Sequence, residues 1–316
     1  MLTLITHYSP VSLRKAGQAS LITNNKGMAL VLTLLVLALI TALVVEFSYA
    51  VYTNTNALYN WKTSQRLSFV AKSGVQLASK TILEEVMQHP SYTYPGSLNI
   101  PIESPFEDFK GTVLLRIEDE NSKFNINSIV YSNGALNDEA YHSFVRLLRA
   151  LGIESGIADR IVDWIDPDKE PRLSDSEKAS KNLYLDSIDE LLLIPGIDNT
   201  IYEKIATYVT IYGDGLININ GAEIPVLMSL SDSINKNMAE RIVAYRKISP
   251  FQSGAYIQSV AGITYTIYND FGVRITAKGT HFRIISTVTE EGIKKVIESV
   301  LVISGTSTTV KYWREM

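Results

Sequence analysis

The sequence predicts an α+β protein in which a long N-terminal helix packs on a small antiparallel sheet, with a large helical domain inserted between strands of that sheet. Three observations lead to this prediction. An unbroken apolar segment continues into an amphipathic helix, β-rich segments lie on either side of the middle of the chain, and the middle itself is helical and internally repetitive. The 316 residues are enough for two compact domains.

The composition of the chain excludes several functions. Its formal net charge of −4 argues against a protein that holds nucleic acid by neutralising phosphates. Without cysteine, the chain has no disulfide, no thiolate metal site and no cysteine nucleophile. Its four histidines are scattered, and it contains no glycine-rich phosphate loop, no G-x-S-x-G and no H-E-x-x-H motif. We therefore expect a protein that is not an enzyme.

The N-terminal segment predicts a membrane span. Residues 28–45 contain no charge, which is near the minimum length for a helix that crosses a bilayer. The preceding charges, Arg14, Lys15 and Lys26, are all positive, so this leader should stay in the cytoplasm while the rest of the chain crosses the membrane. No small-residue cleavage site follows the apolar run, which disfavours a secretory signal peptide.

Helical periodicity continues beyond the span. Apolar residues recur at three- and four-residue steps, and no proline interrupts residues 28–88. Roughly sixty helical residues at about 1.5 Å each would form a rod about 90 Å long. The stripe that should pack on a sheet consists of Leu67, Val70, Ala71, Gly74, Leu77, Ala78 and Ile82.

The β-rich segments predict about four antiparallel strands. Residues 111–119 alternate in part between apolar and polar side chains. Residues 281–303 indicate two strands joined by a turn at 289–292, and residues 309–313 form a last strand. This sheet would cover the apolar stripe of the helix, which gives the expected α+β layer.

The segment between the strands, residues 125–275, predicts a helical domain with an internal repeat. Two pairs of similar segments carry the repeat: "FNINSIV" (124–130) with "ININGAEI" (217–224), and "ADRIVDWID" (158–166) with "AERIVAYRK" (239–247). An N-x-N step recurs in the first pair. Its side chains suit hydrogen bonds to nearby backbone that cap a helix, so we interpret Asn125, Asn127, Asn218 and Asn220 as structural.

A rival hypothesis comes from residues 216–264, which resemble the helix-hairpin-helix module of ComEA-type DNA-uptake proteins. Residues 191–210 contain a second hairpin-like turn. In DNA-binding hairpins, glycines let backbone amides approach a phosphate. The turn at 229–233 instead has no glycine and places Asp232 where an anion would sit, Asp198 follows Gly196 in the other turn, and no lysine or arginine gathers beside either turn in the sequence. We expect a packing scaffold and no nucleic-acid partner; the alternative is a membrane-anchored DNA-uptake protein.

The N-terminal segment also resembles type IV prepilins and type II secretion pseudopilins. The shared features are a basic leader, Lys26-Gly27, and then Met28-Ala-Leu-Val-Leu at the start of a long helix. The resemblance implies that prepilin peptidase cuts between Gly27 and Met28 and that Met28 is N-methylated. Leu32 stands where most of these proteins have a glutamate that pairs with the N-terminal amine of a neighbouring subunit. The absence of this glutamate is typical of minor pseudopilin K, which is placed at the pilus tip.

Features of the head are similar to the same family. The asparagine steps, the paired helical units, the flanking sheet and the terminal "VKYWREM" (310–316) resemble minor pseudopilin K (GspK) of the type II secretion system, which carries a sterile-alpha-motif-like domain inserted in a pilin sheet. The resemblance implies an inner-membrane, single-pass subunit with a periplasmic head. It would form or cap the tip of the pseudopilus that drives protein export across the outer membrane.

The implied partners are the minor pseudopilins of the I, J and H types, the major pseudopilin, prepilin peptidase and the inner-membrane assembly platform. A minor pilin of a type IV pilus and a plain anchored periplasmic domain remain alternatives. The expected division of the chain is a leader (1–27), a transmembrane part (28–46), a periplasmic helix half with the first strand (47–124), the inserted domain (125–275) and the C-terminal strands (276–316).

The densest carboxylate cluster is "DWIDPDKEPRLSDSE", residues 163–177. Four of its acids fall at positions 1, 3, 5 and 12 of an EF-hand-like frame, and hard oxygen ligands suit calcium. Pro171 stands where an EF-hand needs glycine, so we do not expect a true EF-hand. Minor pseudopilin K holds calcium in a loop at this place, and the resemblance supports a calcium site. The candidate ligands are Asp166, Asp168, Glu170, Asp175 and Glu177.

Two other interpretations of this cluster stay open. One is a solvated charged loop without a metal, which is the usual state of such a run. The other is a catalytic carboxylate pair, because Asp163 and Asp166 lie three residues apart and could share a helix face. No other feature of the sequence supports hydrolysis.

Overall fold

The computed structural model describes residues 25–102, 109–178 and 180–316. The chain forms two compact units, of which the first ends at Trp61 and the second begins at Lys62. The leader up to residue 24, with Arg14 and Lys15, lies outside the described residues.

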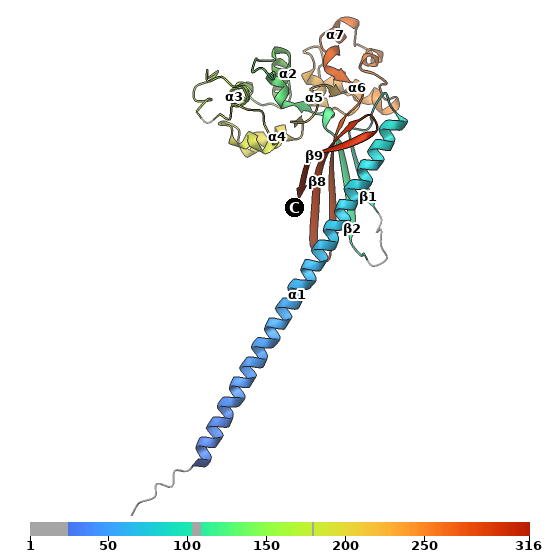
Figure 1. Ribbon diagram of the computed structural model, residues 1–316. Coiled ribbons are helices and arrows are strands. Elements are labelled where there is room, and N and C mark those ends of the chain that lie inside the picture. Colours follow the sequence, from blue (N-terminus) through green and yellow to red (C-terminus); the bar gives the residue numbers. More distant parts are fainter. Residues whose placement is uncertain (1–24, 103–108, 179) are drawn as a thin grey trace, which may run out of the picture. The chain divides into compact units, whose positions relative to one another are not determined.

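Helix α1, Asn25–Gln88, runs through both units, as the sequence predicts (Figure 1). In the first unit, every side chain from Gly27 to Trp61 is exposed. This part contains the one helix of the described residues that is long and apolar enough to cross a membrane, by length and composition. A continuous exposed surface of leucine, valine and isoleucine is stable only when lipid or other apolar helices cover it.

In the second unit, the rest of α1 packs on a five-stranded antiparallel sheet. The strand order is β1-β2-β7-β8-β9, one strand more than predicted. The edge strand β1 was not predicted, because "SLNIPI" contains a proline, which strands tolerate at an edge. The strands are β1 (Ser97–Ile102), β2 (Thr112–Asp119), β7 (His281–Glu290), β8 (Ile293–Ser304) and β9 (Ser307–Glu315).

The core between helix and sheet contains five residues of the predicted stripe, together with Val75 and Val86 of the same helix, which were not predicted. Leu67, Ala71 and Ala78 are almost completely buried, whereas Leu77 is 51% exposed because it lies at the margin of the stripe. Gly74 lets helix and sheet approach closely, since a Cβ there would lie 2.6 Å from Ser286 Oγ.

The insert lies between β2 and β7 and has its own hydrophobic core, as expected. Figure 1 shows helices α2 to α7 gathered at the end of the sheet where β2 ends and β7 begins. Its α-helices are α2 (Asp138–Ala150), α3 (Gly156–Ile165), α4 (Asn199–Ala206), α5 (Ile224–Ser229), α6 (Lys236–Ile248) and α7 (Tyr265–Asn269). Its 3-10 helices are η1 (Glu120–Ser122), η2 (Ile126–Ile129), η3 (Ile188–Leu193), η4 (Gly254–Ser259) and η5 (Gly272–Arg274).

The internal echo of the sequence corresponds to two structural repeats. The first repeat, residues 124–210, is closed by parallel pairing of β3 (Phe124–Asn125) with β4 (Val209–Thr210). The second repeat, residues 217–276, is closed in the same way by β5 (Ile217–Asn218) and β6 (Ile275–Thr276). Each repeat has two helices, then a 3-10 turn, a glycine with positive φ and a short helix.

The asparagine steps start both repeats and have the structural role that the sequence predicts. Asn125 Oδ1 accepts a hydrogen bond from Asn127 N, and Asn218 Oδ1 accepts one from Asn220 N, each at 3.0 Å. The second asparagine of each step then donates to a distant backbone carbonyl, Asn127 to Leu185 and Asn220 to Phe251. These bonds replace regular secondary structure at the point where each repeat leaves its strand.

Candidate metal site and anchoring network

A carboxylate cluster forms where helix α3 ends. Asp163 and Asp166 come from this helix end and Glu177 from the loop that follows, and one carboxylate oxygen of each lies within 4.8 Å of the others. Asp163 is fully buried and Asp166 is 3% exposed. The carbonyl end of a helix adds partial negative charge at this position, so the environment favours a cation.

The buried oxygens of the cluster lack donors. Among the described residues, Asp163 Oδ1, Asp166 Oδ1 and Glu177 Oε1 have no hydrogen-bond partner, and neither has Asn182 Oδ1 in the same loop. Unpaired buried polar atoms are rare and cost about 1–3 kcal/mol each. A hard divalent cation takes oxygen ligands of this kind. The residues present therefore fit a metal ion such as calcium.

The acidity of Asp166 indicates the same lack of positive charge. Burial and the neighbouring negative charges of Asp168, Asp163 and Glu177 raise the pKa of Asp166 to about 7, although Arg172 acts in the opposite direction. A cation bound beside this carboxylate would keep it ionised.

Asp163 also fixes the path of the loop. Its Oδ2 accepts hydrogen bonds from Arg172 N at 2.9 Å and from the hydroxyl of Ser176. Its Oδ1 lies 3.5 Å from Arg172 Nε. One oxygen of Asp163 therefore holds the loop on helix α3, and the other faces charged groups.

Of the five predicted ligands, the structure brings Asp166 and Glu177 together and leaves the other three outside the cluster. Asp168 accepts a hydrogen bond from Glu170 N, Glu170 is exposed, and Asp175 pairs with Lys178 at the surface. The EF-hand-like frame fails because the loop folds back around Asp163. Asp163 could have been identified from the sequence, because it is an acidic residue inside the otherwise apolar segment "RIVDWI". It also lies three residues before Asp166, which places both side chains on one face of the helix.

The predicted cleavage site, Gly27 and Met28, lies in the first turns of α1. Both residues are exposed, and a Cβ added at Gly27 would meet no atom within 4 Å.

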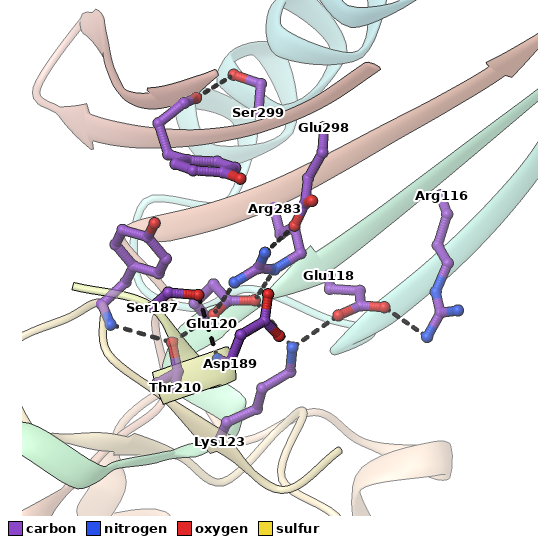
Figure 2. Close-up of polar contacts among 12 residues, drawn as sticks. Arg116, Glu118, Glu120, Lys123, Ser187, Asp189, Thr210, Arg283, Glu298 and Ser299 are labelled. Carbon is purple, nitrogen blue, oxygen red and sulfur yellow. Dashed lines mark hydrogen bonds and ion pairs between the residues drawn. The ribbon is translucent and has the colours of Figure 1, made fainter. Parts of the chain in front are cut away.

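A network of ion pairs joins the sheet to the first repeat (Figure 2). Glu120 is fully buried and lies 2.9 Å from both Lys123 Nζ and Arg283 Nε. It also accepts a hydrogen bond from the hydroxyl of Thr210 in β4. Burial alone would raise the pKa of Glu120, but the positive charges of Lys123 and Arg283 outweigh burial and lower that pKa to about 2.

The same network extends across the sheet. Figure 2 shows Arg283 of β7 between Glu120 and Glu298 of β8, and Lys123 between Glu120 and Glu118 of β2. The guanidinium of Arg283 also lies 5.6 Å from the ring centre of Tyr212. The first repeat is thus anchored by charges of alternating sign.

The second repeat is anchored by the adjacent residue, Asp119. Its carboxylate accepts hydrogen bonds from Asn218 Nδ2 at 2.6 Å, from Asn121 N at 2.9 Å and from the hydroxyl of Thr93 at 3.3 Å. Burial raises the pKa of Asp119 to about 6, although these hydrogen bonds act against it. Gly279 approaches this carboxylate so closely that an added Cβ would lie 2.3 Å from Asp119 Oδ2.

The two hairpin-like turns differ in part from the sequence expectation. Asp198 caps helix α4 by accepting from Ile201 N at 2.8 Å, so a carboxylate occupies the place of an external anion. No basic residue gathers beside these turns in the sequence, but in the folded chain Arg146 and Arg149 of helix α2 pair with Asp232. Tertiary folding brings these residues together from more than eighty positions away.

Comparisons with known proteins agree with this division of the insert. Residues 122–214 match the family model of the type II secretion system (T2SS) protein K, and residues 214–271 match that of the helix-hairpin-helix motif. The border between the two matches lies between the two structural repeats.

Curated relatives cover more of the chain. The type II secretion system protein K of Pseudomonas aeruginosa is 26% identical over 310 residues, which cover 88% of this chain and 89% of that protein. The protein K of Klebsiella pneumoniae is 25% identical over 222 residues, which cover 62% of this chain and 66% of that protein.

Among solved structures, the fold is similar to a chain in the crystal structure of the GspK-GspI-GspJ complex from the enterotoxigenic Escherichia coli type 2 secretion system. The TM-score is 0.65 at 17% identity, and the match covers 81% of this chain and 98% of the other.

Proposed function

We infer that this chain is a member of the type II secretion system protein K family and acts as a minor pseudopilin, by assembly rather than by catalysis. One observation carries the inference. The family domain is inserted in an antiparallel sheet that packs on the same helix whose N-terminal part is apolar and fully exposed.

The exposed apolar part of α1 explains how such a subunit would work. In the inner membrane, lipid covers its side chains. Leaving the membrane exposes them to water at a cost of about 25 cal/mol per Å², unless helices of neighbouring subunits cover them. The free energy therefore favours transfer from lipid into a fibre of similar helices, with the head on the periplasmic side.

The insert determines the position in the fibre. Residues 120–276 form a body with its own core at one end of the sheet, and such a body does not fit inside a narrow shaft. We place the subunit at the tip of the pseudopilus. The complex that contains GspK, GspI and GspJ supports minor pseudopilins of the I and J types as partners; the H type, the major pseudopilin and the assembly platform follow from the same role.

The first experiment concerns processing by prepilin peptidase. Mass spectrometry of the protein from cells that possess the peptidase should find a mature chain that begins at an N-methylated Met28. A matched Gly27→Leu variant should keep its leader. A wild-type chain that retains residues 1–27 in these cells would contradict the pseudopilin role and favour a plain membrane anchor.

We also propose that the cluster at the end of α3 holds calcium through Asp163, Asp166 and Glu177. The unpaired buried oxygens support this site. Bound calcium would supply positive charge there, and Asp163 would link the ion to the loop through Arg172 N and Ser176. Its role would be to order the loop between α3 and η3.

The helix-hairpin-helix match favours a second candidate function, binding of DNA by the insert. Two contacts argue against it: Asp198 caps its own helix, and Asp232 neutralises Arg146 and Arg149. We expect no gel shift of a DNA duplex at 100 mM salt. A shift that disappears at high salt and in an Arg241→Gln variant, whose side chain lies beside the turn at Gly262, would instead support this function.

A further inference from the structure

The side chain of Arg172 lies at the carboxylate cluster without forming a hydrogen bond to it. Its Nε is 3.5 Å from Asp163 Oδ1, which is one of the buried oxygens without a hydrogen-bond partner among the described residues. The Arg172 side chain is 34% exposed and Asp163 is fully buried. The arginine therefore enters the site from the solvent side.

The two oxygens of Asp163 have different tasks. Oδ2 accepts hydrogen bonds from Arg172 N at 2.9 Å and from the Ser176 hydroxyl, so both of its hydrogen-bond partners belong to the loop. Oδ1 is the oxygen left for a ligand. Because the backbone of Arg172 is held through Oδ2, its side chain is able to swing toward solvent without unfolding the loop.

Arg172 supplies the positive charge that acts on this cluster. Its guanidinium forms the one ion pair with this cluster among the described residues, at 3.5 Å from Nε to Asp163 Oδ1. Of the other basic residues in this loop, Lys178 pairs with Asp175, Lys181 pairs with Asp186 and Glu190, and Lys169 is exposed at the surface. A positive charge that competes for buried carboxylates weakens the binding of a second cation at the same place.

We propose that Arg172 is a built-in counter-cation, which neutralises Asp163 when the site holds no metal and is displaced toward solvent when a divalent cation binds. This inference rests on the proposed cation site and adds its regulation. The arginine keeps the loop folded at low calcium and sets the affinity well below that of the carboxylates alone. The site therefore responds to the calcium concentration of its compartment instead of remaining permanently loaded.

The test is a calcium titration by calorimetry on the full-length protein in detergent. Arg172→Met removes the charge and keeps most of the side-chain stem, and Lys178→Met is the matched control in the same loop. We expect Arg172→Met to bind calcium about 5- to 30-fold more tightly than wild type. Lys178→Met should stay within about twofold, because its partner Asp175 lies outside the cluster.

A stability measurement gives an independent readout. In EDTA, Arg172→Met should unfold at a lower temperature than wild type, because the buried carboxylates of Asp163 and Asp166 lose a neighbouring positive charge. Saturating calcium should reverse the order of the two proteins. If Arg172→Met does not fold without calcium, Arg172→Lys provides the second variant: it keeps the charge and should bind within about threefold of wild type.

The outcomes separate the inference from the site on which it rests. Equal or weaker calcium binding by Arg172→Met overturns the counter-cation role while the site itself stands. Absence of calcium binding by wild type and all variants overturns both. Neither result bears on assembly of the subunit, which the N-terminus of the mature chain tests.

Discussion

The two repeats of the insert share one framework but complete it differently. In the first repeat, the end of helix α3 holds Asp163 and Asp166 with oxygens that lack partners among the described residues. In the second, the end of helix α6 holds the buried Arg246, which donates to the backbone carbonyls of Ile219 and Ala222 at 2.7 and 2.6 Å. The second repeat therefore satisfies the groups at this helix end with its own arginine, whereas the first leaves buried oxygens that the proposed cation would bind.

The repeats also differ in how they attach to the sheet. Adjacent acids at the end of β2 serve them: Glu120 binds Thr210 of the first repeat, and Asp119 binds Asn218 of the second. Basic residues surround Glu120 and lower its pKa to about 2, whereas burial raises the pKa of Asp119 to about 6. The two anchors therefore differ in when they take up a proton: Glu120 stays ionised far below neutral pH, whereas Asp119 becomes protonated as the pH falls below about 6.

The largest effect is expected for Asp163→Ala in the first repeat. It removes one cation ligand and both bonds that hold the loop, so calcium affinity should fall at least about 100-fold and the free energy of unfolding by about 2–4 kcal/mol. Asp175→Ala is the matched control and should change the affinity less than about threefold. Calorimetry measures the calcium affinity and urea unfolding measures the stability. If both variants lost calcium affinity equally, Asp175 would be a ligand, as in the EF-hand-like ligand set.

The corresponding change in the second repeat is Arg246→Met. It leaves two buried carbonyls without donors, so the free energy of unfolding should fall by about 2–4 kcal/mol. The loss should be the same in calcium and in EDTA, because this repeat contains no part of the carboxylate cluster. Lys247→Met, at an exposed neighbouring position, should cost less than about 0.5 kcal/mol. If the loss of stability in Arg246→Met depended on calcium, the two repeats would not differ in the way described above.

A smaller effect concerns the anchor of the second repeat and depends on pH. The pKa of Asp119 rises from 3.8 in the unfolded chain to about 6 on folding, so the folded state binds the additional proton between these values. Stability from Asp119 is therefore gained as the pH falls. From pH 7 to pH 5, wild type should gain about 1 kcal/mol relative to Asp119→Asn.

The anchor of the first repeat has the opposite sign in a lower pH window. The folded pKa of Glu120, about 2, lies below its unfolded value of 4.5, so stability from Glu120 is lost only as the pH falls from 4.5 toward 2. Urea unfolding in EDTA at pH 7 and 5 should therefore report Asp119 and not Glu120. Equal pH dependence in wild type and Asp119→Asn would contradict this assignment.

The smallest effect is expected at the surface turn of the second repeat. Arg149 and Asp232 pair with side chains that are both 71% exposed, so Arg149→Ala should change the free energy of unfolding by less than about 0.5 kcal/mol. Arg146→Ala should cost more, because this side chain is 14% exposed and also donates to the backbone carbonyl of Ser229. Thermal unfolding compares the stabilities of the two variants. A larger loss of stability for Arg149→Ala than for Arg146→Ala would contradict this order.

Local patterns in the sequence were sufficient for helix α1 and for four of the five strands of the large sheet. The periodicity of α1 and the alternation in β2 and β7 depend on which face of each element is buried, and the pattern of neighbouring residues records this directly. The exceptions are the edge strand with Pro101, which lacks such a pattern, and Leu77 at the margin of its stripe.

The candidate site was less accessible to sequence reasoning. Spacing identified the acidic segment, but the ligands depend on how the loop returns to Asp163, which is a tertiary property. The same holds for Arg146 and Arg149 at Asp232. The internal sequence repeat predicted that the two halves of the insert share a framework. It did not predict that carboxylates lie at the end of α3 and an arginine at the end of α6.

The most direct test of this difference is amide hydrogen exchange on the full-length protein with and without calcium. We expect calcium to slow exchange in the loop of the first repeat, residues 166–182, while the second repeat, residues 217–276, exchanges at the same rate in both conditions. Unchanged exchange in the loop, or equal slowing in both repeats, would show that the two repeats do not differ in their need for a cation.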